Sequence, residues 1–220
     1  MNWLRQNFPD VADLALKHLW LSVCAIALSI CIAVPLGWIA NHAPFLRGPL
    51  TTGTGLLYSV PSLPLLIAIP VVLGLPLQSD VTIIVALTVY GVALLVRSAT
   101  DAFRAISNDV TLSATAIGYS SWSRFWRVDL PLAGPLLLAG IRVVVVSTVS
   151  LVTIGAVVGI SSLGTLLTDG FQRGITAEIF TGLILTIVVA MLLDGCCLAA
   201  DRMLFPWHRA PSHLRKRQLS

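Results

Sequence analysis

The sequence predicts an all-α polytopic membrane protein with about five transmembrane helices. Of its 220 residues, 56% are hydrophobic and only 11% are charged, and the mean hydropathy is +0.90. Soluble domains carry roughly 25% charged residues, so a water-soluble fold is excluded. The apolar stretches are continuous and reach the ~20 residues of a spanning helix, whereas a barrel strand shows alternation over ~10 residues. Helices are therefore expected in place of a barrel.

Five apolar stretches are the candidate spans. They cover residues 19–40, 50–77, 81–96, 132–160 and 179–200. The second stretch contains Pro61, Pro64, Pro70 and Pro76, which remove backbone donors and bend a helix. Broken backbone in lipid persists only beside protein or a water-filled cavity. This stretch is a candidate for lining a path, although proline is also simply commoner in membrane helices than in soluble ones.

Lysine and arginine in the connections predict the orientation, because cytoplasmic loops carry the excess of positive charge. One side would hold Arg47, Arg97, Arg104, Arg124, Arg127 and the basic C-terminal residues. The other side would hold only Arg5, Lys17 and Arg173. We expect an extracytoplasmic segment at 1–18, a transmembrane domain at 19–205 and a basic cytoplasmic tail at 206–220. The tail fits a topology determinant or lipid contact, with no nucleic-acid partner.

The longest polar connection covers about residues 105–131 and is expected in the cytoplasm. Asn108 or Asp109 can cap a short helix through Ile117, and Gly118 can end it in the left-handed conformation. Ser120 or Ser121 can cap a second short helix. Pro131 would then open the next span, since proline suits the first helical turn.

The second short helix would carry an aromatic face. Trp122, Phe125 and Trp126 follow helical spacing i, i+3, i+4, opposite Arg124 and Arg127. Two interpretations stay open on this spacing. The face rests at headgroup depth on the membrane, or it fills a socket on a cytoplasmic partner.

This connection resembles the signature loop of the permeases of binding-protein-dependent ABC importers. That signature reads E-A-A, three residues, G, nine residues, I, x, L, P. Gly118, Leu130 and Pro131 match it at the right spacing, Ala114 matches its second alanine, and Val128 replaces the isoleucine. Leu112 replaces the glutamate and Ser113 the first alanine.

Further segments resemble the osmoprotectant branch of the same family, which imports glycine betaine, carnitine or choline. These segments are Ser59-Val-Pro-Ser-Leu63, Ala139-Gly-Ile-Arg142 and Ser162-Leu-Gly164. The resemblance implies a type I importer fold in a bacterial inner membrane, paired with a second permease subunit, identical or homologous. It also implies two cytoplasmic ATPase subunits and an extracytoplasmic solute-binding protein. The loop would then couple to the ATPase, which favours partner docking for the aromatic face.

The sequence offers no catalytic or cofactor site of its own. A Walker A loop ends in Gly-Lys-Ser or Gly-Lys-Thr, yet the lysines Lys17 and Lys216 follow Leu16 and Arg215. ATP and magnesium are therefore expected on the partner ATPase. The four histidines, at positions 18, 42, 208 and 213, lie outside the apolar stretches, and no cysteine spacing fits a metal site.

Two intramembrane groups are candidate functional residues. Asp194 lies inside the last stretch and is expected to pair with Arg142, although an intramembrane carboxylate also fits an ion-coupled secondary transporter. The absence of an internal repeat speaks against that class. Tyr58 and Tyr90 offer aromatic faces to a quaternary ammonium, and core packing or an interfacial position stays open as the alternative. The candidate solute path comprises Tyr58, Ser59, Pro61, Ser62 and Tyr90.

Overall fold

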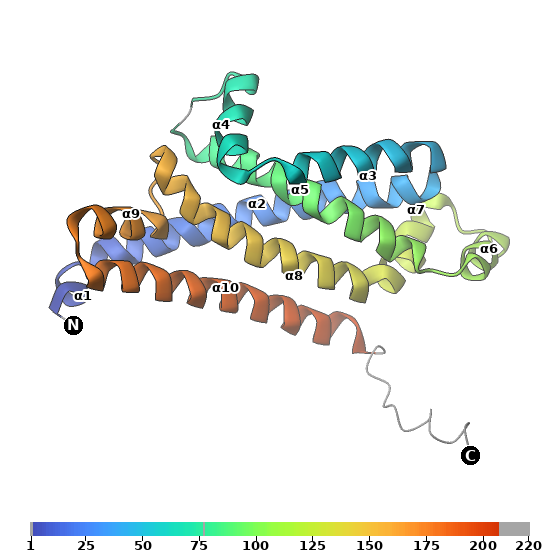
Figure 1. Cartoon of the computed structure of the whole chain (residues 1–220). Coiled ribbons are helices and arrows are strands. Elements are labelled where there is room, and N and C mark those ends of the chain that lie inside the picture. The colour runs from blue at the N-terminus through green and yellow to red at the C-terminus, as the bar shows by residue number, and fades with distance from the viewer. Residues whose placement is uncertain (1, 77, 207–220) are drawn as a thin grey trace, which may run out of the picture.

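The computed structural model describes residues 2–76 and 78–206, and every regular element in those ranges is a helix. The helices form an elongated bundle whose N-terminal end lies opposite the end that carries α6 (Figure 1). This confirms the all-α prediction. The elements are α1 (Asn2–Gln6), α2 (Phe8–His42), α3 (Pro44–Ser59), α4 (Ser62–Leu73), α5 (Asp80–Arg104), α6 (Asn108–Ala116), α7 (Ser121–Arg124), the π-helix η1 (Phe125–Asp129), α8 (Leu130–Ile154), the 3-10 helix η2 (Gly155–Val158), α9 (Leu163–Arg173) and α10 (Thr176–Leu204).

The number of candidate spans agrees with the prediction of about five. In the described residues, four helices are long and apolar enough to cross a membrane: α2, α5, the continuous helix Ser121–Val158, and α10. The pair α3 and α4 together would supply a fifth span, but the chain bends by 112° between these two helices.

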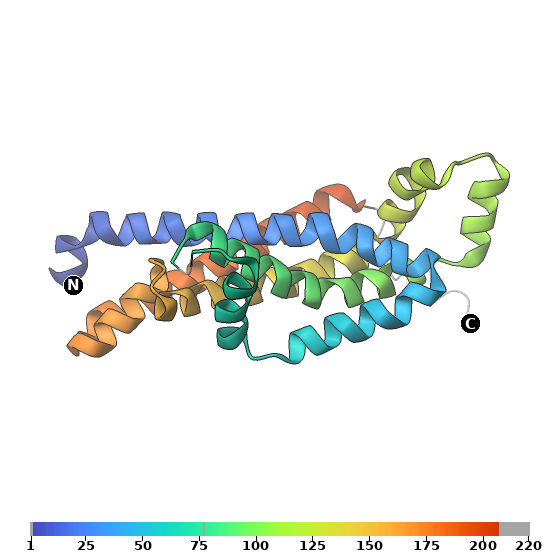
Figure 2. The same ribbon diagram turned by 90° about the horizontal axis from the view of Figure 1, so that it is seen from above.

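The break between α3 and α4 follows from proline chemistry. Val60, the residue before Pro61, is extended with ψ 129°, as the steric demands of a following proline favour. Pro61 and Pro64 also lack the N–H groups that would continue the backbone ladder. As a result α4 stands away from the long axis of the bundle (Figures 1 and 2). The second apolar stretch is therefore two helices joined at a sharp break, and not one continuous helix.

The expected boundary at residue 18 has no counterpart in the structure, because α2 runs without interruption from Phe8. Val11 is buried, and Leu14 and Ala15 pack beside it against residues of α9 and α10. His18, expected outside the apolar core, is fully buried within α2. These contacts extend the helix before the apolar stretch begins. The basic tail from residue 207 onward, with His208 and His213, lies outside the described residues.

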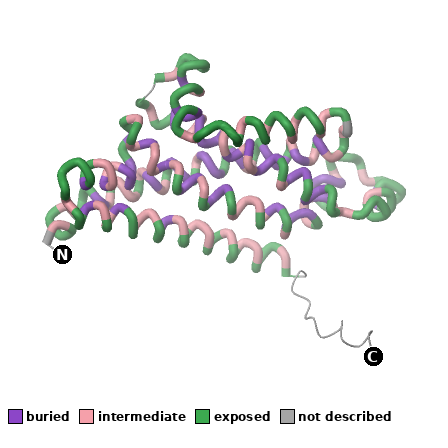
Figure 3. Tube along the Cα trace, in the orientation of Figure 1, coloured by how far each residue is buried: buried purple, intermediate pink, exposed green. Residues whose placement is uncertain are grey.

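The core lies between α2, α5 and α8, where the buried residues concentrate (Figure 3). α2 and α5 approach closely because Gly37 has no side chain. A Cβ at Gly37 would lie 2.9 Å from the backbone of Ala99 and Thr100. α10 is peripheral: only 6% of its apolar window is buried, compared with 33–50% in the other three spans.

Candidate functional site

The short helix α6 projects beyond the end of the bundle (Figures 1 and 2). It ends at Gly118, whose φ of +98° is the left-handed region that the sequence predicts there. The backbone N–H of Gly118 donates to the Thr115 carbonyl and that of Tyr119 to the Ala114 carbonyl, which satisfies the helix end. Leu112 and Ile117 are 67% and 78% exposed. α6 therefore presents apolar side chains away from the bundle.

Ser113 and Ala114 divide between the two sides of α6. Ser113 is exposed, whereas Ala114 is 6% exposed and turns toward the rest of the protein. The helix begins after Ser107, one residue earlier than the predicted caps at Asn108 or Asp109.

The second part of the loop is not a separate helix. Ser120 caps α7 by accepting a hydrogen bond from the Ser123 N–H at 3.3 Å, as predicted. From there α7, η1 and α8 run on as one continuous helix, Ser121–Val158, and Pro131 stands in the first turn of α8 within it. Pro131 lacks an N–H and its ring crowds the carbonyl four residues earlier. The π-helical turn η1 immediately before it accommodates this proline, as wider turns inside helices do.

The predicted aromatic face divides into one buried and two exposed rings. Phe125 is 5% exposed and its ring centroid lies 5.2 Å from that of Trp38 and 6.2 Å from that of Phe103. Trp122 and Trp126 are 68% and 53% exposed. Both line an apolar groove of about 620 Å³ together with residues of α2 and α8, among them Leu130. Phe125 is thus a core residue, and only the two tryptophans are accessible to lipid or a partner.

Arg124 is the centre of a buried polar cluster that the sequence did not reveal. It was expected opposite the aromatic face, yet it is 8% exposed and its Nε donates to Asp129 Oδ2 at 3.3 Å. Trp38 Nε1 donates to the same oxygen at 2.9 Å. Arg124 also donates to Thr115 Oγ1 at 3.3 Å and contacts His42 Nε2. This Arg124 cluster joins α2, α6, α7 and η1.

The partners of the Arg124 cluster are far apart in sequence, which explains why local patterns missed them. Trp38 and Asp129 are 91 residues apart, and His42 and Arg124 are 82 apart. The available signal was Asp129 itself, a carboxylate directly before the apolar start of a span. A carboxylate in that position requires a cation or donors to stay ionised.

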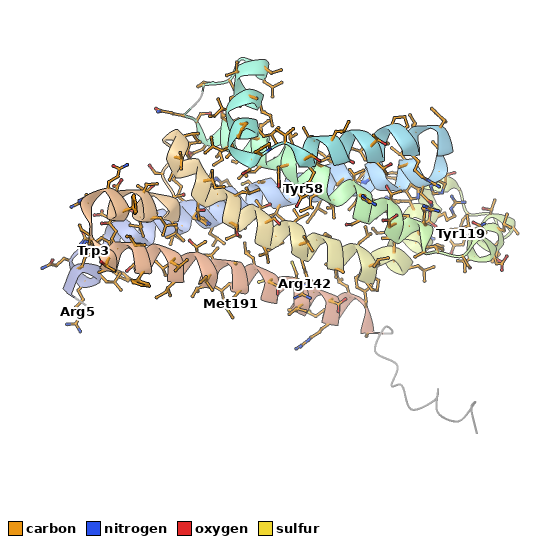
Figure 4. The ribbon with its side chains drawn as sticks, viewed as in Figure 1. Trp3, Arg5, Tyr58, Tyr119, Arg142 and Met191 are labelled. Carbon is orange, nitrogen blue, oxygen red and sulfur yellow. The ribbon has the colours of Figure 1, made fainter. Side chains whose placement is uncertain are left out.

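The candidate solute-path residues gather where α3, α4 and α5 meet. The rings of Tyr58 and Tyr90 lie 5.4 Å apart between centroids, inclined at 46°. Tyr58 is 47% exposed and lies at this junction in Figure 4. Ser62 and Tyr90 line a narrow crevice with apolar residues of α4 and α5. Ser59 is exposed and its hydroxyl donates to the Gly55 carbonyl at 3.0 Å, while Pro61 forms the break itself.

Arg142 and Asp194 form a bidentate ion pair between α8 and α10 (Figure 4). The Arg142 Nε and a terminal nitrogen donate to the two carboxylate oxygens at 2.6 and 2.8 Å. The two side chains are 40% and 23% exposed. Bidentate geometry satisfies both charges within the protein. Among the described residues, no group of three or more His, Cys, Asp or Glu side chains is arranged to hold a metal.

Residues 33–207 match the model of the family described as the binding-protein-dependent transport system inner membrane component. The osmoprotectant import permease protein OsmW of Salmonella typhimurium is 29% identical over 199 residues, covering 88% of this chain and 91% of that protein. The glycine betaine/carnitine/choline transport system permease protein OpuCB of Bacillus subtilis is 26% identical, with 94% of each chain covered.

The fold is also similar to solved structures. A chain of the MetNI methionine ABC transporter in an inward-facing conformation superposes with a TM-score of 0.78 at 20% identity, covering 88% of this chain and 95% of that one. A chain of an amino acid ABC transporter crystallised with histidines superposes with a TM-score of 0.67 at 14% identity, covering 94% and 97%. At these identities the likeness concerns the fold.

Proposed function

This chain belongs to the family of binding-protein-dependent transport system inner membrane components, the multi-pass permease subunits of ABC importers, and from that premise we propose that it moves a small osmoprotectant across the membrane. The observation that carries the proposal is the set of relatives along most of the chain. The permeases OsmW and OpuCB, aligned over 88% and 94% of it, serve osmoprotectants or glycine betaine, carnitine and choline. The chain lacks an ATPase domain, so a partner subunit hydrolyses ATP.

The structure supports a quaternary amine as the solute. Tyr58 and Tyr90 place two aromatic faces together at the break between α3 and α4. An ammonium over such a face gains about 0.5–2 kcal/mol, depending on how far it is desolvated. In this proposal the broken pair α3–α4 gives the permease an element that can change its angle during alternating access.

In this proposal α6 docks into a cytoplasmic ATPase subunit, and the assembly contains two permeases, two ATPases and an extracytoplasmic binding protein. The support is the projection of α6 with the exposed side chains of Leu112 and Ile117. Truncating large apolar anchors in a protein groove often weakens association by more than tenfold. Docking on this end requires the N-terminus outside and the C-terminus inside, as the positive charges predict.

The ion-coupled alternative rested on the intramembrane carboxylate of Asp194 and on the proline-broken second stretch. The bidentate contact with Arg142 accounts for this charge structurally, so no described observation favours coupling to an ion.

Reconstitution of the whole transporter tests the proposed function. The permease is incorporated into liposomes with its ATPase and binding protein, and uptake of labelled glycine betaine, carnitine and choline is measured with and without ATP. We expect ATP-dependent accumulation of at least one of them. Accumulation of a methionine or histidine label in preference to all three would overturn the osmoprotectant assignment and leave the importer assignment intact.

A further inference from the structure

A polar groove of about 470 Å³ opens between α3 and α5 near the α6 end of the bundle. Arg47 and the neighbouring threonines line it from α3, and Arg97, Asp101 and Arg104 line it from α5. Three guanidinium groups face one carboxylate here, which leaves a formal charge of +2 (three minus one) on the groove.

These charges are not neutralised within the described part of the chain. The ion pairs found in residues 2–76 and 78–206 use other arginines and aspartates. Arg47 donates to the backbone carbonyls of Ala40 and Asn41 at 3.4 and 3.2 Å, which holds its guanidinium beside the groove without changing its charge. The groove therefore keeps a surplus of donors and positive charge for an external anion.

The position of Arg97 indicates which medium the groove faces. Arg97 is exposed and lies seven residues before the end of α5 at Arg104, which is about 10 Å into the span at 1.5 Å per residue. An unpaired cation at such a depth is strongly disfavoured against hydrocarbon. Arg142, also within a span, is by contrast paired with a carboxylate. The α3–α5 face is therefore turned to water, whereas the apolar face of α10 suits lipid.

The aromatic pair lies on the same helical face as the cations. Tyr90 and Arg97 are seven residues apart on α5, so both side chains project from one side of the helix. Tyr58 and Arg47 belong to the adjacent α3. The adjoining faces of α3 and α5 thus carry a site suited to an ammonium group, at the tyrosines, and a site suited to an anion, at the arginines.

We propose that the α3–α5 groove is a binding station for the carboxylate of the solute, so that the permease favours zwitterionic quaternary amines such as glycine betaine and carnitine over a purely cationic one such as choline. This rests on the proposed function, since the groove is taken to lie on the solute path. A cation alone gains from the tyrosines but is repelled by the arginines. A zwitterion gains from both stations in turn.

Cysteine accessibility tests the water-facing anion site without any solute. Thr52→Cys in the groove and Leu192→Cys on the exposed face of α10 are introduced separately after Cys24, Cys31, Cys196 and Cys197 are replaced. A sulfonate-bearing and a trimethylammonium-bearing methanethiosulfonate are compared. We expect Thr52→Cys to react, faster with the anionic reagent, and Leu192→Cys to react with neither. Adding Arg97→Gln should lower the rate of the anionic reagent about fivefold, the factor for one unit charge about 4 Å away in water.

Transport by the reconstituted complex tests selectivity. Initial uptake rates of glycine betaine and choline are measured with saturated binding protein, and their ratio is compared between variants. Arg97→Gln should lower the betaine-to-choline ratio at least about fivefold, and Arg97→Lys should retain it. Equal loss for both solutes would overturn the proposal, as would a Thr52→Cys site no more reactive than Leu192→Cys.

Membrane composition separates a solute carboxylate from a lipid phosphate. If the groove belonged to an anionic headgroup, phosphatidylglycerol would abolish the anionic reagent preference and Arg97→Gln would leave the solute ratio unchanged, which would overturn the proposal. If the wild-type complex carried none of these solutes, the proposed function would fail, and the cysteine result would still decide whether the anion site exists.

Discussion

Replacing Asp129 with alanine should destabilise the permease strongly, because this carboxylate is the shared acceptor of the Arg124 cluster. Asp129 is 3% exposed and accepts from Trp38 Nε1 at 2.9 Å and Arg124 Nε at 3.3 Å. Removing one partner of a buried ion pair costs about 3–5 kcal/mol, since the other charge is left uncompensated. At about 2–4 °C per kcal/mol for a chain of this size, the melting temperature should fall by about 6–20 °C.

Thermal unfolding of the detergent-solubilised permease, at matched expression, measures this effect. Asp129→Asn keeps an oxygen for Trp38 and should cost less, about 1–3 kcal/mol. Asp109→Ala, on the exposed side of α6, is the matched control and should melt like the wild type. The double variant with Arg124→Ala should lose less than the sum of the single losses, because it strands no charge. A wild-type melting temperature for Asp129→Ala would refute the structural role of the cluster.

Three further predictions follow from the loop and the topology. Gly118→Val should reduce the solute-stimulated ATP hydrolysis of the assembled transporter while membrane insertion persists, because valine resists the φ of +98°. Normal stimulated hydrolysis in this variant would contradict the reasoning. Trp122→Ala with Trp126→Ala should weaken co-purification of the ATPase more than tenfold if the tryptophans dock, and retention at wild-type levels would assign them to lipid. Cysteines that replace Asp10 and Ala116 should react with impermeant reagents from opposite sides of the membrane. Labelling of both from the same side would contradict an odd number of spans between these two positions.

The helical class and the spans were predictable because a segment that crosses lipid must be apolar along its whole length, which the amino-acid composition shows directly. The positive φ at Gly118 and the cap at Ser120 were predictable for a different reason, since both depend on a few neighbouring residues. The continuity of α7, η1 and α8 was not predicted, because a proline in a first turn usually marks a helix start, whereas here a π-helical turn precedes the proline within one continuous helix. The early start of α2 was also missed, since it depends on packing against α9 and α10.

The site residues show the same division between local and distant causes. Trp122, Phe125 and Trp126 follow one helical face in sequence, yet Phe125 is buried by Trp38 and Phe103, which belong to α2 and α5. The burial of Arg124 likewise depends on Trp38. Trp38 shares the acceptor Asp129 with Arg124 and is 91 residues from Asp129 in the sequence. Periodicity identifies a face but not what covers it, so core residues and accessible ones could not be told apart in advance.

The replacement of the signature glutamate by Leu112 changes what holds the proposed docking contact together. Leu112 of α6 and Ile117 at its C-terminal end are exposed apolar side chains, while the Arg124–Asp129 ion pair of the adjoining cluster is buried. A contact made by such side chains gains stability from apolar area removed from water, which salt does not screen, whereas an exposed ion pair would weaken with ionic strength. In the same cluster Arg124 connects Thr115 of α6 to His42 of α2 directly, and to Trp38 of α2 through Asp129. Under the proposed docking, force applied to α6 therefore reaches α2 through the polar contacts of the Arg124 cluster, while Leu112 and Ile117 supply apolar area to the docking surface.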